Sequence, residues 1–351
     1  MKFKKFTLIL LVLMGAVLLS SCTGALTGTS WPGISTNADT VYVSYLNRVY
    51  AVRANDGSTI WQYPAKAGRE TFFAAPVVAD GNLIVGSYQN NLYSLDPNTG
   101  SLKWTFSQAK GKFIATPLVA DGKIFAPNGD YSLYALDLNG KLLWQFSTKQ
   151  ALWSQPVSDS VNVYQASMDH HIYAIDFNTG KEVWSVDLGG AILFSPTLSP
   201  DGVLYVSTLA RNLVAISTGT GDIIWQRTFD TDLWTQPALS DTKLFFGDIG
   251  GKVYSISAQD GSDIWSQSVN EPVIGLATQL PNGIVFATEK GSLIAMTFDG
   301  QRLWSRTFDG TIYTGPAPVG ANLAVGIVKG ADFLKLINDS GQDVWSYVPP
   351  K

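Results

Sequence analysis

The amino-acid sequence predicts an all-β protein, and three observations carry this prediction. First, tryptophan recurs at nearly constant spacing, with 39 to 43 residues from one position to the next: Trp61, Trp104, Trp144, Trp184, Trp225, Trp265, Trp304 and Trp345. Second, a glycine stands four residues before each of these tryptophans. Third, short runs rich in β-branched and aromatic residues alternate with turn residues, and no long amphipathic helical pattern follows residue 31.

Each repeat divides into four predicted strands. In the third repeat these are PLVAD, KIFAP, SLYALDL and KLLWQF, which lie within residues 117–146. Turn pairs that accept positive φ angles in tight hairpins separate the first two strands of several repeats: Asp80-Gly81, Asp121-Gly122, Asp201-Gly202 and Asn282-Gly283. The glycine before each tryptophan predicts a second hairpin turn with positive φ.

A repeat of about 40 residues that forms four strands is typical of one blade of a β-propeller. One blade cannot bury both faces of its sheet, whereas a closed ring buries them between neighbours. Eight repeats therefore predict a single eight-bladed β-propeller of four-stranded antiparallel blades over residues 31–351. A small residue nine or ten positions before each tryptophan is expected to make room for the indole, and Lys335 is the exception in the eighth repeat.

The first 30 residues carry the signals of export and lipid attachment. Three lysines among the first five residues precede an apolar run from Leu8 to Leu19, which is too short to span a membrane well and suits a signal peptide. The run ends in LSSC, which is similar to the lipobox of bacterial lipoproteins. We therefore predict a lipoprotein signal peptide over residues 1–21, lipidation of Cys22 and a tether over residues 22–30. An ordinary signal peptide is the alternative.

Composition excludes several classes of function. Cys22 is the only cysteine in 351 residues, which excludes a disulfide framework, a cysteine-rich metal site and a thiol-based active site. Three of the 24 lysines and arginines lie in residues 1–21, so the rest of the chain has 21 basic and 28 acidic residues and a net charge of −7. No long basic run follows Cys22, which argues against nucleic acid as a partner. His170 and His171 are the only histidines, and neighbours on a strand point to opposite faces, so we expect no metal site there.

The repeat, written A-x-D-x-x-T-G-x-x-x-W, resembles the tryptophan-docking motif of PQQ-type propellers, and the resemblance extends from Trp31 to Trp345. In that family the ring is wedged between blades, which implies a structural role for the eight repeated tryptophans. PQQ-dependent dehydrogenases carry the quinone beside a calcium ion on the propeller axis, with a catalytic aspartate, a vicinal cysteine pair and long insertions. This chain has no cysteine pair and no room for such insertions, so we predict a non-catalytic protein without PQQ or calcium. A PQQ-dependent dehydrogenase is the alternative.

Among PQQ-type propellers, the length, the lipobox and the blade number most resemble the BamB family, the lipoproteins of outer-membrane β-barrel assembly. That resemblance implies a lipid-anchored, monomeric scaffold that binds protein partners, among them a barrel assembly complex. Retention of a lipoprotein at the inner membrane requires an aspartate directly after the lipidated cysteine, and this chain has Thr23 at that position. We therefore expect the periplasmic face of the outer membrane, or the outer face of the cytoplasmic membrane in a cell without one. In that family loops between blades dock to the barrel subunit, and the corresponding loop here, Leu188 to Phe194, has no charge, so the resemblance does not identify the partner. A propeller that binds a small ligand or a carbohydrate is the alternative.

Bulky apolar residues recur three positions before the proline that opens the innermost strand of several repeats. In a propeller this segment leads from the rim to the axis, so equivalent residues ring one mouth of the central channel. The candidate binding surface at this mouth comprises Phe73, Trp153, Gln155, Phe194, Trp234, Gln236 and Tyr313, with Ile114 and Leu193 at equivalent positions. Exposed aromatic side chains there would suit a peptide, a sugar or a loop of a partner. Packing between the innermost strands is the alternative.

Replacing the cysteine that is predicted to carry lipid tests the anchor. In Cys22→Ala we expect an uncleaved or soluble protein, because an anchor of several acyl chains holds a protein at a membrane more strongly than protein contacts do. The measurement is the mass of the purified chain, together with its distribution between membrane and soluble fractions. An unchanged mass and an unchanged membrane fraction would contradict lipidation of Cys22.

Overall fold

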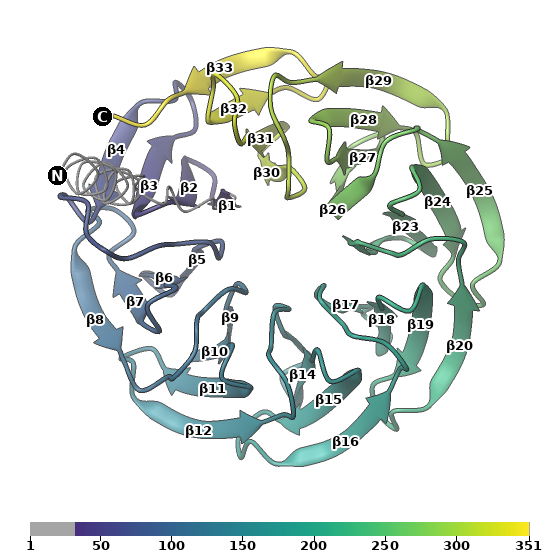
Figure 1. Cartoon of the computed structure of the whole chain (residues 1–351), viewed down its shortest axis with the longest axis horizontal. Coiled ribbons are helices and arrows are strands. Elements are labelled where there is room, and N and C mark those ends of the chain that lie inside the picture. The colour runs from purple at the N-terminus through teal and green to yellow at the C-terminus, as the bar shows by residue number, and fades with distance from the viewer. Residues whose placement is uncertain (1–31, 351) are drawn as a thin grey trace, which may run out of the picture.

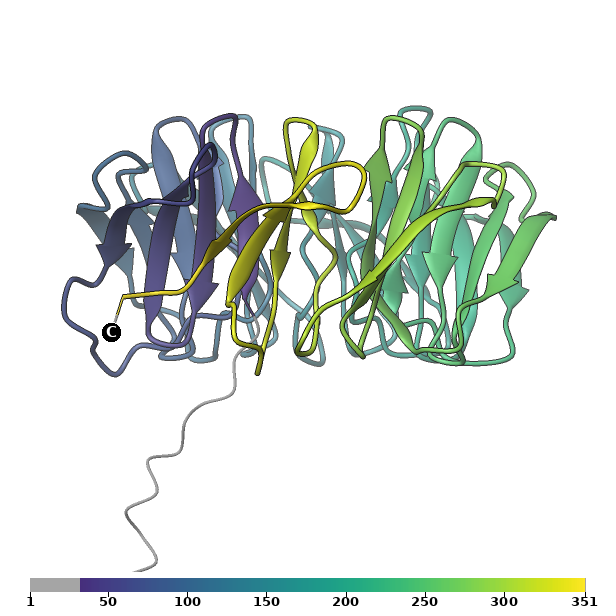
Figure 2. The same cartoon turned by 90° about the horizontal axis from the view of Figure 1, so that it is seen from above.

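The computed structural model describes residues 32–350, which form strands β1 to β33, arranged as eight sheets around a central axis (Figure 1). Seen from the side, the blades stand side by side and run from one face of a disc to the other (Figure 2). Within residues 32–350 there is no helix, and so none that is long and apolar enough to cross a membrane. The predicted all-β, eight-bladed propeller is confirmed. The predicted signal peptide, Cys22 and the tether lie outside the described residues.

The strands of each blade follow one another from the axis to the rim. Blade 1 consists of β1 (Gly33–Thr36), β2 (Thr40–Tyr45), β3 (Arg48–Arg53) and β4 (Thr59–Tyr63). Blade 2 consists of β5 (Val77–Ala79), β6 (Asn82–Gly86), β7 (Leu92–Leu95) and β8 (Leu102–Phe106). Blade 3 consists of β9 (Leu118–Ala120), β10 (Lys123–Pro127), β11 (Ser132–Asp137) and β12 (Leu142–Ser147). Blade 4 consists of β13 (Val157–Ser158), β14 (Asn162–Ala166), β15 (His171–Asp176) and β16 (Glu182–Asp187).

The second half of the chain repeats this order. Blade 5 consists of β17 (Thr197–Leu198), β18 (Val203–Ser207), β19 (Asn212–Ser217) and β20 (Ile223–Thr228). Blade 6 consists of β22 (Ala238–Ser240), β23 (Lys243–Gly247), β24 (Lys252–Ser257) and β25 (Asp263–Ser268). Blade 7 consists of β26 (Val273–Leu280), β27 (Gly283–Thr288), β28 (Ser292–Met296) and β29 (Arg302–Thr307). Blade 8 consists of β30 (Ala317–Val319), β31 (Asn322–Gly326), β32 (Leu334–Ile337) and β33 (Asp343–Tyr347).

One short strand departs from this pattern. β21 (Thr235–Gln236) precedes blade 6 but pairs in parallel with β26 of blade 7, where Gln236 lies opposite Leu276. β26 has an irregular register around Gly275, which has a φ of +77°. The backbone N–H of Gly275 donates to the carbonyl oxygen of Trp234 at 3.1 Å. The sheet of blade 7 therefore contains five strands, and blades 6 and 7 share a backbone connection near the axis.

The hairpin turns between the first two strands of each blade follow the prediction in part. Both residues have positive φ in Asp80-Gly81 and Asp121-Gly122, but only the glycine does in Asp201-Gly202, and neither does in Asn282-Gly283. A Cβ on the last of these glycines would collide with the carbonyl oxygen of Met296. At that position, lack of space rather than positive φ accounts for the glycine.

Each repeated tryptophan joins its blade to the next blade around the ring. Trp104 of blade 2 donates its indole N–H to the carbonyl oxygen of Leu138 in blade 3 at 2.9 Å. Its ring lies against Gly140, where a Cβ would come within 2.7 Å of the indole. Gly140 has a φ of +81°, so it supplies both the predicted turn and the space for the ring. The same contacts recur at every junction, where the acceptors for Trp61 to Trp345 are, in chain order, the carbonyl oxygens of Pro97, Leu138, Phe177, Thr218, Ala258, Phe298, Asp339 and Ala54, at 2.7 to 3.3 Å.

The last tryptophan closes the ring onto the first blade. Trp345 donates to the carbonyl oxygen of Ala54 at 2.8 Å, and its ring covers Gly57. Thr59 and Tyr347 add a hydrogen bond of 3.0 Å between their hydroxyls across the same junction. Blade 1 contains β1 to β4 and blade 8 contains β30 to β33, so neither blade combines strands from both ends of the described chain.

The small residue that precedes each tryptophan lies opposite it in the same sheet. In blades 1 to 7 this partner is alanine or serine. In blade 8 the register pairs Trp345 with Leu336, so the assignment of the exceptional position to Lys335 is wrong. The turn before Trp345 is one residue shorter than the turn in blade 1, and this shifts the equivalent position. Lys335 instead forms an ion pair with Asp332 at 2.7 Å.

Apolar packing completes each junction between blades. Residues 32–350 form eight clusters of buried apolar side chains, and each one draws its members from two neighbouring blades. Between blades 2 and 3, for example, Leu92, Phe113 and Ile124 are fully buried. The hydrophobic core is therefore divided among the junctions, and each junction combines an apolar cluster with one docked tryptophan.

Gly140 and Gly122 form a matched pair for testing the docking contact. Both lie in turns of blade 3 with positive φ, but a Cβ on Gly122 meets nothing within 4 Å. Gly122→Ala should cost only the left-handed backbone, about 1–2 kcal/mol of unfolding free energy. Gly140→Ala should cost a further ~1–3 kcal/mol, because the new methyl group overpacks against Trp104.

Chemical unfolding of both variants measures these costs. In a Trp104→Ala background the two alanine substitutions should cost the same free energy, since the ring that distinguishes them is absent. A difference that persists in that background would exclude the tryptophan as its cause.

Candidate functional site

Two kinds of loop share one face of the disc. Because the four strands of a blade alternate in direction, the crossovers from each outermost strand to the next innermost strand lie on the same face as the loops between second and third strands. We call this the mouth face. The hairpin turns between first and second strands and between third and fourth strands form the opposite face.

Three of the predicted mouth residues are exposed. Trp153 and Trp234 are 42% and 43% exposed, and Tyr313 is 38% exposed. They lie in the crossovers that lead to blades 4, 6 and 8. Burial between the innermost strands, the alternative interpretation, therefore does not describe these three side chains.

The other two predicted aromatic residues lie deeper. Phe73 is only 6% exposed and stacks on Tyr88, with ring centroids 4.3 Å apart. The Nζ atom of Lys112, from the next crossover, lies 4.2 Å from the centre of the Tyr88 ring. Phe194 is partly buried. For Phe73 the packing interpretation holds.

The two glutamines that share a sequence motif have different surroundings. The side-chain Nε2 of Gln155 donates to the carbonyl oxygen of Pro117 at 3.2 Å, and its backbone N–H donates to the hydroxyl of Ser195 at 3.0 Å. Gln155 thus connects blade 4 to blades 3 and 5. Gln236 instead lies in β21, beside Leu276 of blade 7. The two surroundings differ because only the second motif forms a strand with the blade that follows.

Sequence reasoning missed further apolar residues of the mouth face. Leu276 is 41% exposed and lies next to the β21 segment that follows Trp234. No proline follows it at the position that marks the other crossovers, so the pattern did not include it. Tyr131 and Ile249, in loops between second and third strands, are 49% and 36% exposed. We call Trp153, Trp234, Leu276 and Tyr313 the mouth patch.

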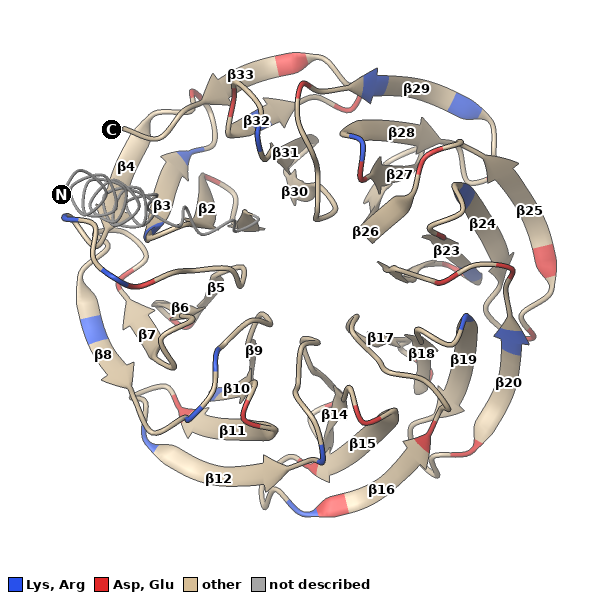
Figure 3. Cartoon of the chain, in the orientation of Figure 1, with Lys and Arg blue, Asp and Glu red and all other residues tan. Residues whose placement is uncertain are grey.

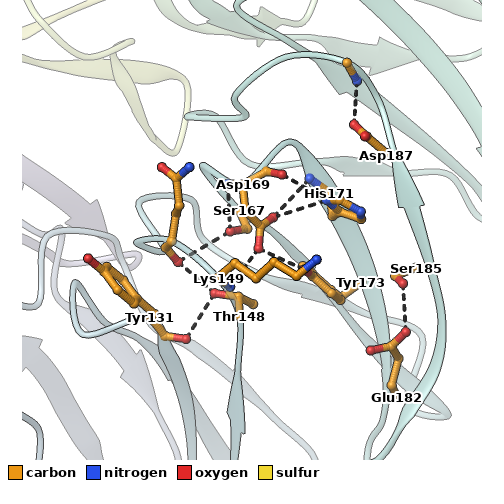
Figure 4. Close-up of polar contacts among 12 residues, drawn as sticks. Tyr131, Thr148, Lys149, Ser167, Asp169, His171, Tyr173, Glu182, Ser185 and Asp187 are labelled. Carbon is orange, nitrogen blue, oxygen red and sulfur yellow. Dashed lines mark hydrogen bonds and ion pairs between the residues drawn. The ribbon is translucent and has the colours of Figure 1, made fainter.

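Buried carboxylates hold the crossovers in place beneath these residues. Figure 4 shows Asp169 in blade 4, whose carboxylate accepts the backbone N–H of Lys149 at 2.9 Å and the hydroxyl of Tyr173 at 2.8 Å. Burial alone would raise the pKa of Asp169, but these hydrogen bonds and the N–H of His171 outweigh it and lower the pKa. Burial and the same carboxylate raise the pKa of Tyr173. Asp130 with Tyr134 and Asp248 with Tyr254 repeat the pair, each at 2.7 Å.

The two histidines lie at the end of the same loop. His170 is an exposed turn residue with a φ of +78°, and His171 begins β15. The Nδ1 atom of His171 lies 2.9 Å from the carbonyl oxygen of Asp169. Among residues 32–350 no group of three or more histidine, cysteine, aspartate or glutamate side chains is arranged to hold a metal ion.

Figure 3 colours the acidic and basic residues of the chain in the view down the axis. By their place in the strands and turns, the face opposite the mouth carries aspartates in every blade. One set lies in or beside the turn between third and fourth strands: Asp56, Asp96, Asp137, Asp176, Asp222, Asp260, Asp299 and Asp339. A second set lies in the turn between first and second strands of blades 1 to 6: Asp39, Asp80, Asp121, Asp159, Asp201 and Asp241. Several cap turn backbones, and hydrogen bonds from the hydroxyl and N–H of Ser262 lower the pKa of Asp260 to about 2. We call this the acidic face.

Comparison with known proteins identifies relatives of most of the ring. The family model described as outer membrane protein assembly factor BamB matches residues 46–169, 168–280 and 250–350. A protein of that name from Moranella endobia is 28% identical over 249 residues, which cover 65% of this chain and 62% of that protein. Another from Yersinia pestis is 26% identical over 287 residues, which cover 73% of this chain and 70% of that protein. This chain thus spans a little less than two thirds of the Moranella protein.

A solved structure has the same architecture. BamB from Moraxella catarrhalis matches with a TM-score of 0.75 and 18% sequence identity, over 87% of this chain and 95% of that chain. At this identity the likeness concerns the fold alone. The family model, in contrast, matches sequence from β3 to β33, and on that basis this chain belongs to the BamB family of PQQ-type propellers.

Proposed function

We propose that this chain is a non-catalytic, lipid-anchored scaffold that supports the assembly of β-barrel proteins at the outer membrane. The match to the BamB family model over residues 46–350 carries this proposal, since its relatives are named outer membrane protein assembly factors. The proposed partner is a barrel assembly complex. The proposed location is the periplasmic face of the outer membrane, where a monomeric ring is held by lipid on Cys22.

The construction of the ring suits a scaffold. Every blade is fixed to both neighbours by a docked tryptophan and an apolar cluster, so loops from distant parts of the sequence keep fixed positions relative to one another. The mouth patch is the proposed contact surface. Large aromatic side chains such as Trp153 and Trp234 contribute much of the binding energy where they become buried at an interface.

The polar groups near the mouth support a structural role over a catalytic one. Asp169 is 8% exposed. Its carboxylate accepts three hydrogen bonds, from the backbone N–H groups of Lys149 and His171 and from the hydroxyl of Tyr173. Asp130 and Asp248 have equivalent tyrosine partners. A carboxylate that is held ionised by fixed donors, with its lone pairs engaged, is a poor general base.

Recovery of partners from membranes tests the scaffold. After crosslinking in cells, the tagged lipoprotein should copurify with subunits of the outer-membrane barrel assembly complex. Cells that lack the chain should contain less folded outer-membrane β-barrel protein, measured by the change in gel mobility on heating.

A matched control separates the ring from its anchor. Residues 1–30 fused to an unrelated soluble domain should reach the same membrane and recover none of these subunits. If the intact chain also recovers none, and the amount of folded barrel protein does not depend on it, the scaffold proposal is wrong.

A thermal shift distinguishes the scaffold from a PQQ enzyme. A ligand that binds only the folded protein raises its melting temperature, and the shift grows with the ratio of ligand concentration to dissociation constant. With PQQ and calcium added together, we expect no shift and no dye-linked oxidation of alcohols or sugars. A saturable shift of several degrees would favour the dehydrogenase alternative.

A further inference from the structure

One position in the crossovers of the mouth face carries charges that are sorted by sign around the ring. Each crossover contains an apolar anchor, at most 1% exposed, four positions before the proline, or Ala277, near the start of the next blade. These anchors are Phe72, Phe113, Leu152, Ile192, Leu233, Val273 and Ile312. Three positions before each anchor stands an exposed residue, in chain order Arg69, Lys110, Lys149, Gly189, Asp230, Asn270 and Asp309. The three cations therefore lie in one half of the ring, and the two anions lie in the other.

Hydrogen bonds fix the backbone at the positively charged positions. The backbone N–H groups of the first three anchors donate to carbonyl oxygens in the loop between the second and third strands of the blade that the crossover leaves, at 2.7 to 3.3 Å. Asp130 accepts the backbone N–H of Lys110 at 2.7 Å, and Asp169 accepts that of Lys149 at 2.9 Å. The cations thus belong to crossovers that are held in equivalent places on successive blades.

The net charge of whole crossovers follows the same division. The crossovers that link blades 1 to 4, residues 64–76, 107–117 and 148–156, contain five cations and one anion, a net charge of +4. The crossovers that link blades 5 to 8, residues 229–237, 269–272 and 308–316, contain four anions and no cation, a net charge of −4. Loops between second and third strands add −2 over blades 1 to 4, from Asp130 and Asp169, and zero over blades 5 to 8. The mouth face therefore has a positive half and a negative half.

The charges at the repeated position are available to a partner. None of the ion pairs among residues 32–350 involves Arg69, Lys110, Lys149, Asp230 or Asp309. At physiological ionic strength the Debye length is about 8 Å, so a partner in contact with the face meets the sign of each half rather than their average.

The apolar residues of the mouth patch do not by themselves fix how a partner is rotated on the ring. Trp153, Trp234 and Tyr313 lie in the crossovers to blades 4, 6 and 8, at intervals of two blades. A rotation by two blades carries the first of these positions onto the second and the second onto the third. On the rim, an exposed aliphatic residue precedes the docked tryptophan in seven of the eight blades, so the rim gives no direction either. The sign of the charge distinguishes one rotation from the others.

We propose that the mouth face binds a folded protein domain of complementary polarity, which is acidic where it meets the crossovers that link blades 1 to 4 and basic where it meets those that link blades 5 to 8. The inference rests on the proposed function, which supplies the partner, and adds the charge of the partner's surface and its rotation on the ring. Apolar contacts provide affinity, and the two halves steer the approach and bring like charges together in the wrong rotations.

The presence of both signs favours a protein over other large partners. A bilayer of anionic lipid and a nucleic acid each present charge of one sign, so the negative half of the mouth face would repel either of them. A folded domain can present acidic and basic side chains on separate parts of one surface. It can therefore match both halves at the same time.

Reversing the two halves without changing the net charge tests the proposal. The reversed variant combines Lys110→Asp and Lys149→Asp with Asp230→Lys and Asp309→Lys, so the composition of the chain is kept. A control variant makes the same exchange at exposed turn residues of the acidic face: Lys141→Asp, Lys181→Asp, Asp201→Lys and Asp222→Lys. The barrel assembly complex is purified from cells that lack this chain, and its binding to the immobilised lipoprotein is followed by biolayer interferometry.

The expected result is a loss that depends on both arrangement and salt. At about 50 mM salt the reversed variant should associate with the complex about tenfold more slowly than the parent or more, and at ~500 mM salt within about threefold of it. The control variant should bind like the parent at both salt concentrations. All four substitutions of the reversed variant are at exposed positions, so its melting temperature should change little. If it does not fold, Lys149→Asp with Asp309→Lys, on opposite sides of the ring, decides.

Equal association of the parent and the folded reversed variant at low salt would overturn the inference and leave the scaffold proposal intact. Equal losses in the reversed and control variants would do the same, because the arrangement on the mouth face would not matter. Tighter binding after Asp230→Lys and Asp309→Lys alone would reveal a partner surface of one sign and would also overturn it. If the parent binds the complex at neither salt concentration, the scaffold proposal is wrong, and the inference, which describes that complex, falls with it.

Discussion

The contact between an indole ring and the glycine turn of the next blade is the interaction on which the rest of the structure depends. It joins residues about 36 positions apart, Trp104 and Gly140 for example, and so ties each blade to a neighbour rather than to itself. One hydrogen bond and one close-packed face fix both the distance and the rotation between blades. Repeated eight times, this contact closes the ring, and the crossovers then reach the axis at set positions.

The fold could be predicted from sequence because its signals are local and repeated, whereas the candidate site depends on contacts between repeats. The same pattern position holds Phe73, covered by Tyr88, and Trp153, which nothing covers to the same extent. Whether an aromatic residue in a crossover is buried is decided by the neighbouring crossover and loop, and no periodicity within one repeat records that. Leu276 escaped because Ala277 follows it where the other crossovers have proline, so the pattern that marked those crossovers is absent here.

The two faces of the disc differ because their turns have different tasks. Tight hairpins on the acidic face need short side chains that cap backbone N–H groups, and aspartate supplies them in blade after blade. The crossovers on the mouth face are longer, and Asp130 and Asp169 each accept a backbone N–H of a crossover. Apolar side chains on their outer surface, such as Trp153 and Trp234, remain exposed.

Since Trp345 meets Ala54 and Gly57 with the contacts used at every other junction, the seam between blades 8 and 1 is equivalent to the other seven. A ring of this kind has no privileged starting point, and cutting the chain at another crossover while joining its present ends gives a circular permutant with the same set of interfaces. Gain or loss of a whole blade would likewise change the diameter of the ring without creating a new type of junction. Such rearrangements would change which blade contains the first strand of the chain, and so the position around the ring at which the described chain begins.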